Sequence, residues 1–320
     1  MVGKLDPEAL EAHVFSRTGA PDERVTLGPA PGEDAAAIDL GPDSLVVSSD
    51  PISLAAEAAG TLGVPVATND VAVTGAEPAW LTSTIFLPND DVEPLETVTT
   101  QLDRSARELD VAIVGGHAEV LDDLSRPLLS LTAMGRTENV CPTGGAEPGD
   151  ELLLTDGAGI EGTAILATDF RESLDSVSEG TLDRAAEFFE EISVLEAARA
   201  LWPTATGLHD PTEGGVLAGV YEFAQAAGAT VKLDRDAVPI RSETRTICDA
   251  MEVDPLRIFG SGALLATVDP DDRERALEDL ADAGIEAAVV GHLVDGDPVV
   301  ETDRERVTAV PRDDCYVLWE

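Results

Sequence analysis

The sequence is poor in basic residues, in aromatic residues and in cysteine. Its 320 residues include only 20 Lys and Arg against 63 Asp and Glu, which gives a formal net charge of −43 at pH 7. Because proteins bind nucleic acids through basic faces that neutralise phosphates, this charge argues against a nucleic-acid partner. Anionic lipid surfaces are disfavoured for the same electrostatic reason.

Long hydrophobic runs are absent as well. No apolar run approaches the roughly 18 residues that cross a membrane, and the first residues, MVGKLDPEALEA, lack a signal-peptide pattern. We therefore expect a soluble, cytoplasmic protein with no membrane partner. The three cysteines, Cys141, Cys248 and Cys315, are widely spaced and include no CxxC pair, which disfavours a disulfide framework and a zinc knuckle.

Hydrophobic residues make up 43% of the chain, enough for a packed core, and the length favours about two domains. The acids are spread along the chain and do not form one tail. Such a surface repels itself at low ionic strength, whereas molar salt shortens the Debye length to about 3 Å and removes most of that repulsion. We therefore expect a halophilic protein from a salt-filled cytoplasm; an acidic protein of an ordinary cell is the alternative.

Short apolar segments, many of them β-branched, predict the strands of the first half at 45–49, 80–87, 111–114 and 128–134. Two helical patterns separate them. One covers 54–75 and is expected to break at Pro65, and the other covers 92–109 with apolar residues three or four apart. Turn-forming residues dominate 137–150 and predict a domain boundary there.

The second half shows the same alternation of strands and helices, which indicates an α/β or α+β protein. Strands are predicted at 151–155, 230–233, 263–268 and 286–290, and helices at 160–168, 182–201, 211–227 and 271–283. In the helix at 211–227, Asp210 is the expected N-cap and Glu213 completes a capping box. The expected division of the chain is 1–140, 141–305 and a tail, 306–320, that carries Cys315.

Four polar residues of the first half stand in contexts that favour a ligand site. Asp34 follows a glycine in PGEDAA, Asp50 ends an apolar strand, and Asn69 and Asp70 interrupt an apolar helical stretch. Strand ends hold ligands in α/β proteins, and neighbouring carboxylates bind hard cations such as Mg²⁺. The plain alternatives are a solvated surface acid at Asp34, a turn residue at Asp50 and a buried cap at the Asn-Asp pair.

A glycine-rich segment follows the strand predicted at 111–114. It consists of Gly115, Gly116, His117, Ala118 and Glu119. The glycines would allow backbone to approach a phosphate closely. His117 is either a ligand or base, or an ordinary loop histidine.

Two further segments are candidates for contact with phosphate. Gly157 and Gly159 belong to a GxGxxG pattern between a strand and a helix. Because the expected second parallel strand with a terminal acid is missing after that helix, we reject a dinucleotide site there and retain only a phosphate contact. The motif HDPTEGG around Asp210 opens a helix whose N-terminus would attract an anion, and a good cap is its plain interpretation.

The order of these motifs is more specific than any one of them. GEDAA, VVSSDP, TNDVAVTGAEP, GGHAEV, GAGIEG, HDPTEGG and FGSGALL follow one another over nearly the whole chain. This series resembles the aminoimidazole ribonucleotide (AIR) synthase superfamily, also called PurM-like, which includes selenophosphate synthetase, thiamine-monophosphate kinase and the hydrogenase maturation protein HypE. The segments TNDVAVTGA and DPTEGG look most like HypE.

The resemblance implies an AIR synthase-like fold of two α/β domains and a homodimer whose N-terminal sheets join into a barrel. It also implies ATP and Mg²⁺ in a cleft, where ATP activates a substrate oxygen as a phosphate ester. For a HypE-like enzyme, the reaction is ATP-driven dehydration of a carbamoylated thiol, with a maturation protein as a partner. Carried over to this sequence, the resemblance assigns Mg²⁺ to Asp34, Asp50 and Asp70, the nucleotide to Asn69, Gly115 and Gly116, and the phosphates to Asp210.

The sequence departs from the HypE pattern at three places. His117 stands where an Asp is usual, so that Glu119 becomes the substitute carboxylate, and Glu213 stands where an Arg is usual. HypE ends in Pro-Arg-Ile-Cys, whose cysteine carries the carbamoyl group, whereas Cys315 is followed by YVLWE. Cys315 is thus either a carrier on a mobile tail or a residue buried by docking of that tail.

The hypothesis therefore names Cys315, His117 and Asp210 as the catalytic residues. Two rival functions stay open. One is a small-molecule kinase or ligase on the same scaffold, in which Cys315 plays no part. The other is a nucleotide-binding regulator without catalytic activity, which the changes at His117 and Glu213 favour.

Overall fold

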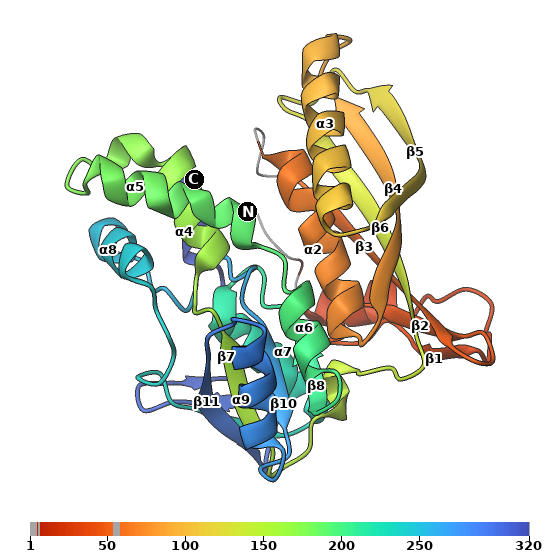
Figure 1. The fold of residues 1–320 in the computed structure, drawn as a ribbon, viewed down its shortest axis with the longest axis vertical. Helices are drawn as coiled ribbons and strands as arrows, with labels where there is room; N and C mark the ends of the chain where they lie inside the picture. The colour runs from red at the N-terminus through yellow and green to blue at the C-terminus, as the bar shows by residue number, and fades with distance from the viewer. Residues whose placement is uncertain (1–4, 6, 54–57, 320) are drawn as a thin grey trace.

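The computed structural model describes residue 5 and residues 7–53 and 58–319, and its strands form two separate sheets (Figure 1). The first sheet consists of β1 (Val25–Leu27), β2 (Ala36–Asp39), β3 (Ser44–Ile52), β4 (Glu77–Leu87), β5 (Ala112–Val120) and β6 (Leu128–Thr137). Their order is β1-β2-β3-β6-β4-β5, with β5 parallel to β4 and the other neighbours antiparallel. A short helix, α1 (Pro7–Leu10), and a π-helical turn, Glu11–Phe15, precede this sheet.

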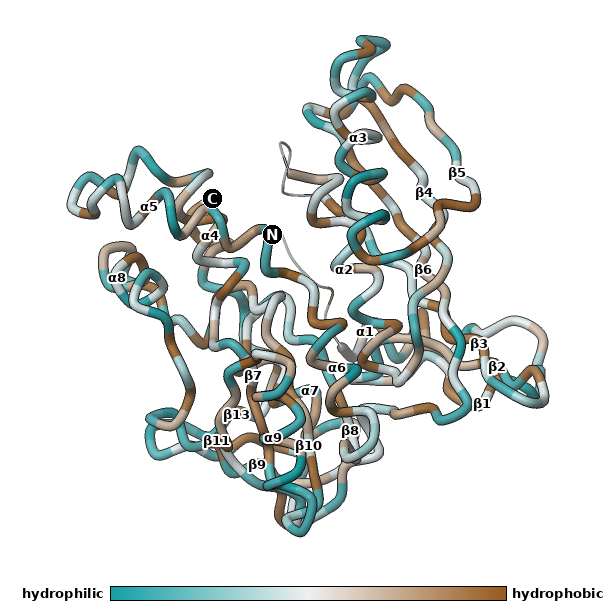
Figure 2. Tube along the Cα trace, viewed as in Figure 1, coloured by the Kyte–Doolittle hydropathy of each residue, from teal (hydrophilic) through white to brown (hydrophobic). Residues whose placement is uncertain are grey.

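Two helices, α2 (Ala59–Val73) and α3 (Val92–Glu108), cover one face of the first sheet (Figure 1). Successive strand residues point to opposite faces, so β4 buries Leu81 and Ile85 beneath these helices. Helix α3 meets them with Val98 and Leu102, which lie one turn apart. The opposite face is rich in Ser and Thr and is more exposed, and hydrophobic residues also remain on the edge strand β5 (Figure 2).

The second sheet has seven strands in the order β13-β12-β9-β11-β7-β10-β8. The strands are β7 (Glu151–Thr155), β8 (Ala205–His209), β9 (Thr230–Leu233), β10 (Leu265–Val268), β11 (Ala287–Val294), β12 (Val300–Glu301) and β13 (Arg306–Val307). The helices of this half are α4 (Ile160–Asp169), α5 (Glu179–Ala186), α6 (Leu195–Leu201), α7 (Gly215–Ala227), α8 (Ser242–Met251) and α9 (Arg273–Asp282). Only the pair of β9 and β12 is parallel among the described strand pairs of this sheet.

Helices cover both faces of the second sheet, and the sequence of β7 reflects this. Leu152 and Leu154 contact the cluster that contains Phe223 of α7, whereas Leu153 joins the cluster of α6 and α9 on the other face. A strand buried on both sides reads as an uninterrupted apolar run, which explains ELLLT. The expected mixed fold of strands and helices with two sheets is therefore confirmed. Within the described ranges, no helix has the length and apolarity that a membrane span requires.

Several predicted elements need correction. Helix α2 runs without a break through Pro65, while residues 54–57 of the predicted helix lie outside the described residues. Proline lacks the N–H that would reach the carbonyl of Thr61, and the Ser105 hydroxyl of α3 donates to that carbonyl at 3.4 Å. The helix predicted at 182–201 is instead α5, a 3-10 helix at Glu187–Glu191, and α6.

Candidate active site

A cavity of about 510 Å³ lies between the two halves of the chain. The first half contributes residues from the loop before β2, from β3 and from α2, and the second half contributes α4, the turn before α7, and the C-terminal segment. Its lining includes acidic, aromatic and hydroxyl side chains, among them Glu33, Asp34, Asp50, Asp70, Glu161, Asp169, Phe189, Thr212, Glu213, Phe259, Ser261 and Trp319.

The three acids predicted to hold a metal line this one cavity. Ser48 links two of them, because its Oγ lies 3.2 Å from Asp50 Oδ2 and 2.5 Å from Asp70 Oδ2. Burial raises the pKa of Asp70 well above its usual value, and the nearby carboxylates of Asp50 and Asp34 raise it further. Like charges forced together in this way favour either a proton or a cation between them.

Asn69 precedes Asp70 on α2 and lies fully buried behind the acids. Its Nδ2 donates to the Ile192 carbonyl and to Asp210 Oδ2, both at 2.9 Å, and its Oδ1 accepts from the Val194 N–H at 3.0 Å. These hydrogen bonds of the Asn69 amide are all made to protein groups. Asn69 therefore joins the first half of the chain to the second, beside the acids but outside the cavity lining.

Asp210 does not cap a helix, contrary to the sequence prediction. It follows β8, a strand that the sequence did not reveal, and α7 begins only at Gly215. Gly214 and Gly215 adopt left-handed conformations with φ of 80° and 66°, and the chain turns at Thr212–Gly215, where the Gly215 N–H donates to the Thr212 carbonyl. A Cβ on Gly214 would lie 2.6 Å from the Pro311 carbonyl oxygen, which shows how closely the C-terminal segment approaches.

The carboxylate of Asp210 is 2% exposed, and burial raises its pKa well above the usual value. Oδ2 accepts from Asn69, but Oδ1 meets no hydrogen-bond donor in the described part of the chain. A buried oxygen without a partner is rare in native proteins and points to an ion, a water or stored strain.

His209 is a site residue that sequence reasoning missed. It ends β8, is 2% exposed, and lies between two carboxylates. Nδ1 is 2.7 Å from Asp34 Oδ2, and Nε2 is 3.1 Å from Glu222 Oε2. Burial by itself lowers the pKa of His209, but the carboxylates of Asp34 and Glu222 raise it to about 10.

The cavity is lined by seven carboxylates and, among its described lining residues, by no Lys, Arg or His. One of them, Glu161, has its pKa raised to about 7 by burial. A triphosphate brought into such a site would be repelled unless cations came with it. No three His, Cys, Asp or Glu side chains in the described ranges are arranged to hold a metal ion on their own. Mg²⁺ commonly takes only one or two carboxylates and completes its shell with water and substrate phosphates, so one or two of the acids Asp34, Asp50 and Asp70 fit that ion.

The structure places Gly115, Gly116, His117 and Glu119 away from the cavity of the same chain. They were predicted in a loop, but β5 continues through them to Val120 and pairs with β4. Gly116 allows this pairing, because a Cβ there would lie 2.0 Å from the Ser83 carbonyl oxygen. All nine residues of β5 are exposed, and the His117 and Glu119 side chains face each other at 3.3 Å.

Gly157 and Gly159 are also absent from the described cavity lining. A Cβ on Gly157 would meet the Pro239 carbonyl oxygen at 3.0 Å, and one on Gly159 would meet Ile258 Cδ1 at 2.9 Å. Protein atoms therefore fill the space in front of both glycines. Both glycines therefore allow close packing of the turn before α4, and the phosphate contact expected from the sequence stays a prediction.

Cys315 lies in a 3-10 helix, Asp314–Trp319, that is docked on the second half of the chain. The cysteine is fully buried in a cluster with Cys248, Phe259 and Tyr316, and burial raises the pKa of its thiol. Of the two alternatives that the sequence left open, the structure shows the docked tail. Trp319, four residues further on, lines the cavity that Cys315 itself does not reach.

Two family models match the chain. The one described as "AIR synthase related protein, N-terminal domain" matches residues 32–137, and the one for the C-terminal domain matches residues 147–303. The hydrogenase expression/formation protein HupE of Azotobacter chroococcum is 30% identical over 277 residues, which cover 82% of this chain and 79% of that protein. Carbamoyl dehydratase HypE of Escherichia coli is 30% identical over 260 residues, with coverages of 79% and 75%.

Solved structures agree with these matches. A chain of the HypE–HypF complex has a TM-score of 0.77 at 24% identity, covering 95% of this chain and 99% of its own. AaThiL in complex with AMPPCP and TMP has a TM-score of 0.78 at 18% identity, covering 98% and 99%. HypE in complex with ATP has a TM-score of 0.70 at 25% identity, covering 96% and 95%.

The two family models together cover most of the chain, which therefore belongs to the AIR synthase-related proteins. Within the family it is close to HypE, the name carried by the Escherichia coli relative and by two of the solved structures described above.

Proposed function

We propose that this protein is an ATP-dependent enzyme of the HypE type. In that reaction the γ-phosphoryl group of ATP is transferred to the oxygen of a carbamoyl group on a thiol. Phosphate then leaves with that oxygen, the nitrogen loses its two protons, and a thiocyanate and ADP remain. The observation that carries the proposal is the convergence of Asp34, Asp50 and Asp70 on one cavity. The relatives named carbamoyl dehydratase and the HypE solved with ATP support it.

The acids of the first half hold the phosphate end of the nucleotide in this proposal. Asp34, Asp50 and Asp70 would bind Mg²⁺, which supplies the charge neutralisation that phosphoryl transfer requires. Ser48 would orient Asp50 and Asp70, and Asn69 would orient Asp210, through the hydrogen bonds already described. Asp210, with one free buried oxygen, is placed to accept a hydrogen bond from a bound group or its water. Phe189, Phe259 and Trp319 give the opposite wall an apolar surface that excludes water.

Cys315 would be the thiol that carries the carbamoyl group, and its delivery requires the tail to leave its pocket. Docking is maintained by Asp313, which accepts hydrogen bonds from the Gly214 N–H at 2.8 Å and the Cys315 N–H at 2.9 Å. The docked state protects the thiol and the undocked state would react. We propose a maturation protein as the partner that supplies the carbamoyl group, by analogy with the relative solved as a HypE–HypF complex.

A small-molecule kinase or ligase is the second candidate. It is favoured by one observation, the complete burial of Cys315 while Trp319 closes part of the cavity. In that case the docked tail is a fixed wall and the acceptor is a separate molecule, as in the fold relative solved with AMPPCP and TMP. Cys315→Ser separates the two candidates, because only the HypE-type reaction loses turnover.

We further propose a homodimer in a salt-rich cytoplasm. Strand β5 is an open sheet edge with Ile113, Val114 and Val120 exposed, and such edges are normally covered. A second copy that packed against β5 would bring Gly115, Gly116, His117 and Glu119 into the dimer interface. The roles predicted for these four residues would then have to be tested in the dimer. Light scattering in molar KCl, with wild type and Val114→Lys compared, measures whether the protein is a dimer through this strand.

The experiment that tests the proposed function is nucleotide binding and hydrolysis in molar KCl with wild type and Asp50→Asn. We expect wild type to bind ATP only with Mg²⁺ present and to form ADP. Asp50→Asn should fold normally and lose binding. ATP binding without product over hours would instead identify a regulator, and binding that ignores Mg²⁺ would refute the metal site.

A further inference from the structure

His209 lies outside every role given so far, and its surroundings are unusual for a core histidine. It connects Asp34, from the first half of the chain, with Glu222 on α7 of the second half. The edge of its ring packs against Phe223 with centroids 5.9 Å apart. The two ring nitrogens are thus both used, and both partners are carboxylates.

The chemistry of these partners defines the hydrogens on the ring. An ionised carboxylate only accepts hydrogen bonds, so each ring nitrogen that faces one must carry a hydrogen. His209 therefore donates in both directions, from Nδ1 to Asp34 Oδ2 and from Nε2 to Glu222 Oε2. Charge-assisted hydrogen bonds of this kind are strong and directional.

The consequence concerns Asp34. Its Oδ2 is held by the imidazole at 2.7 Å, which leaves Oδ1 as the oxygen available to a ligand in the cavity that this residue lines. We propose that His209 is a positioning residue that fixes Asp34 for metal binding, and that Glu222 fixes His209 from behind. This inference rests on the proposed function, because it takes Asp34 to be a ligand of the divalent ion.

Metal-binding carboxylates are commonly held by such outer partners, and loss of the partner lowers metal affinity or activity by about 10- to 100-fold. A histidine that merely tied the two halves together would affect stability alone. Metal affinity of the folded protein is therefore the measurement that separates a positioning role from a structural one.

The experiment is Mn²⁺ binding in molar KCl with AMPPCP present, followed by electron paramagnetic resonance. We expect His209→Gln to weaken Mn²⁺ binding about 10- to 100-fold. The amide keeps one donor for Asp34, but its oxygen then faces Glu222. The double variant His209→Gln/Glu222→Gln supplies a donor to that oxygen, and we expect it to recover part of the affinity. Phe223→Leu, which alters only the packing beside the ring, is the matched control and should bind Mn²⁺ as wild type does.

The outcomes are distinguishable from failure of the proposed function. If wild type binds no Mn²⁺, the metal site itself is wrong. If wild type binds and a folded His209→Gln binds equally well, the positioning role is overturned even when its melting temperature falls. If His209→Gln does not fold, Glu222→Met decides, because it removes the acceptor behind the ring, and an unchanged Mn²⁺ affinity in that variant contradicts the chain of contacts.

Discussion

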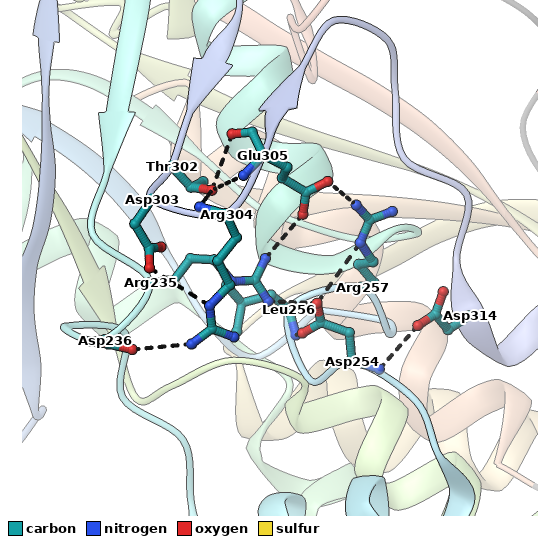
Figure 3. A network of polar contacts seen from close by, with 10 residues as sticks. All are labelled: Arg235, Asp236, Asp254, Leu256, Arg257, Thr302, Asp303, Arg304, Glu305 and Asp314. Atoms are coloured by element: carbon teal, nitrogen blue, oxygen red, sulfur yellow. Dashed lines mark hydrogen bonds and ion pairs between the residues drawn. The ribbon is translucent and has the colours of Figure 1, made fainter.

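Acidic side chains gather in two regions of the molecule, a network behind the C-terminal segment and the cavity. In the network the acids pair with arginines, whereas the described lining of the cavity contains no arginine. Behind the C-terminal segment, Arg235 contacts Asp254 at 2.5 Å and Arg257 contacts Glu305 at 2.6 Å (Figure 3). Asp314 joins this network by accepting from the Asp254 N–H at 3.0 Å, so the network also anchors the tail. The described lining of the cavity holds seven acids and no Arg or Lys, and His209 pairs with one of them, Asp34, from outside that lining.

The difference separates a structural use of acids from a functional one. In the network the acid charge is compensated by the protein, and the side chain of Arg235 is only 7% exposed. In the cavity, burial and mutual repulsion raise the pKa of Asp70, and the nearby Asp210 has an oxygen that meets no donor in the described part of the chain. A site that stores repulsion in this way is stabilised by a cation from solution, which is what a metal-dependent nucleotide site needs.

The largest effect we expect is that of salt. It should act first on the acids of the cavity, whose described lining contains no Arg or Lys. Dilution below about 0.5 M KCl is expected to unfold the protein, because the Debye length grows beyond the spacing of its acids. At the same low ionic strength, MgCl₂ should restore more stability than KCl, by about 2.7 kcal/mol at a hundred times its dissociation constant. Thermal melts followed by circular dichroism measure both effects. A melting temperature unchanged on desalting would refute the halophilic interpretation.

Removing one cavity acid should separate binding from stability. We expect Asp70→Asn to lower Mg²⁺-dependent ATP affinity on the order of 100-fold, since a metal ligand is worth at least as much as its outer partner. The same change should stabilise the nucleotide-free protein by about 1 kcal/mol, because functional sites are commonly built at a cost to stability. Calorimetric titration and urea unfolding in molar KCl measure the two quantities. Asp90→Asn, an exposed acid, is the control.

Removing an arginine from the network should destabilise the protein, whereas removing the cavity acid Asp70 should stabilise it. Arg235→Met leaves Asp254 and Glu305 with Arg257 as their shared Arg partner, and we expect a loss of about 2 kcal/mol, less than for a fully buried pair because both acids are partly exposed. Arg304→Met, whose side chain is 61% exposed in the same network, should cost at most about 0.5 kcal/mol. Equal losses in the two variants, measured by urea unfolding, would mean that burial does not distinguish these pairs.

The sequence carried much of the fold because its periodicities are local. β7 and β9 have the predicted bounds, and α3 is shorter by one residue, since each depends on its own apolar pattern. β8 was missed because ATGLH contains a glycine and too few apolar residues to predict a strand. The 211–227 helix was started too early, since DPTE imitates a capping box while the left-handed glycines after it delay the helix.

The site was predictable only in part, for a different reason. The order of motifs led to Asp34, Asp50 and Asp70, which line one cavity. His209 escaped notice because its partner Asp34 lies 175 residues away, and no local pattern records such a contact. The convergence of side chains from distant segments is a property of packing, and single-sequence reasoning reaches it only through resemblance.

The smallest effect we expect concerns pH and the docked tail, whose buried acid, Asp313, accepts two backbone N–H groups, whereas the cavity acid Asp70 lies beside other carboxylates. Asp313 is 1% exposed, and burial raises its pKa from 3.8 to about 7 in the folded protein. The docked tail therefore binds a proton that the undocked tail releases, so docking is strongest at low pH and weakens as the pH rises through 7. Between pH 6 and 8 the undocked fraction should grow about tenfold.

Alkylation of Cys315 by iodoacetamide, normalised to a free thiol at each pH, measures that fraction. Cys141→Ala and Cys248→Ala, introduced together, leave Cys315 as the single cysteine. Asp313→Asn removes the titrating group while keeping an oxygen that can accept from the Gly214 N–H. We expect its normalised rate to be independent of pH over this range, because nothing in the tail then gains charge. A wild-type rate that also stays constant would show that the tail does not open through Asp313, and Cys315 would then lose its route to the cavity.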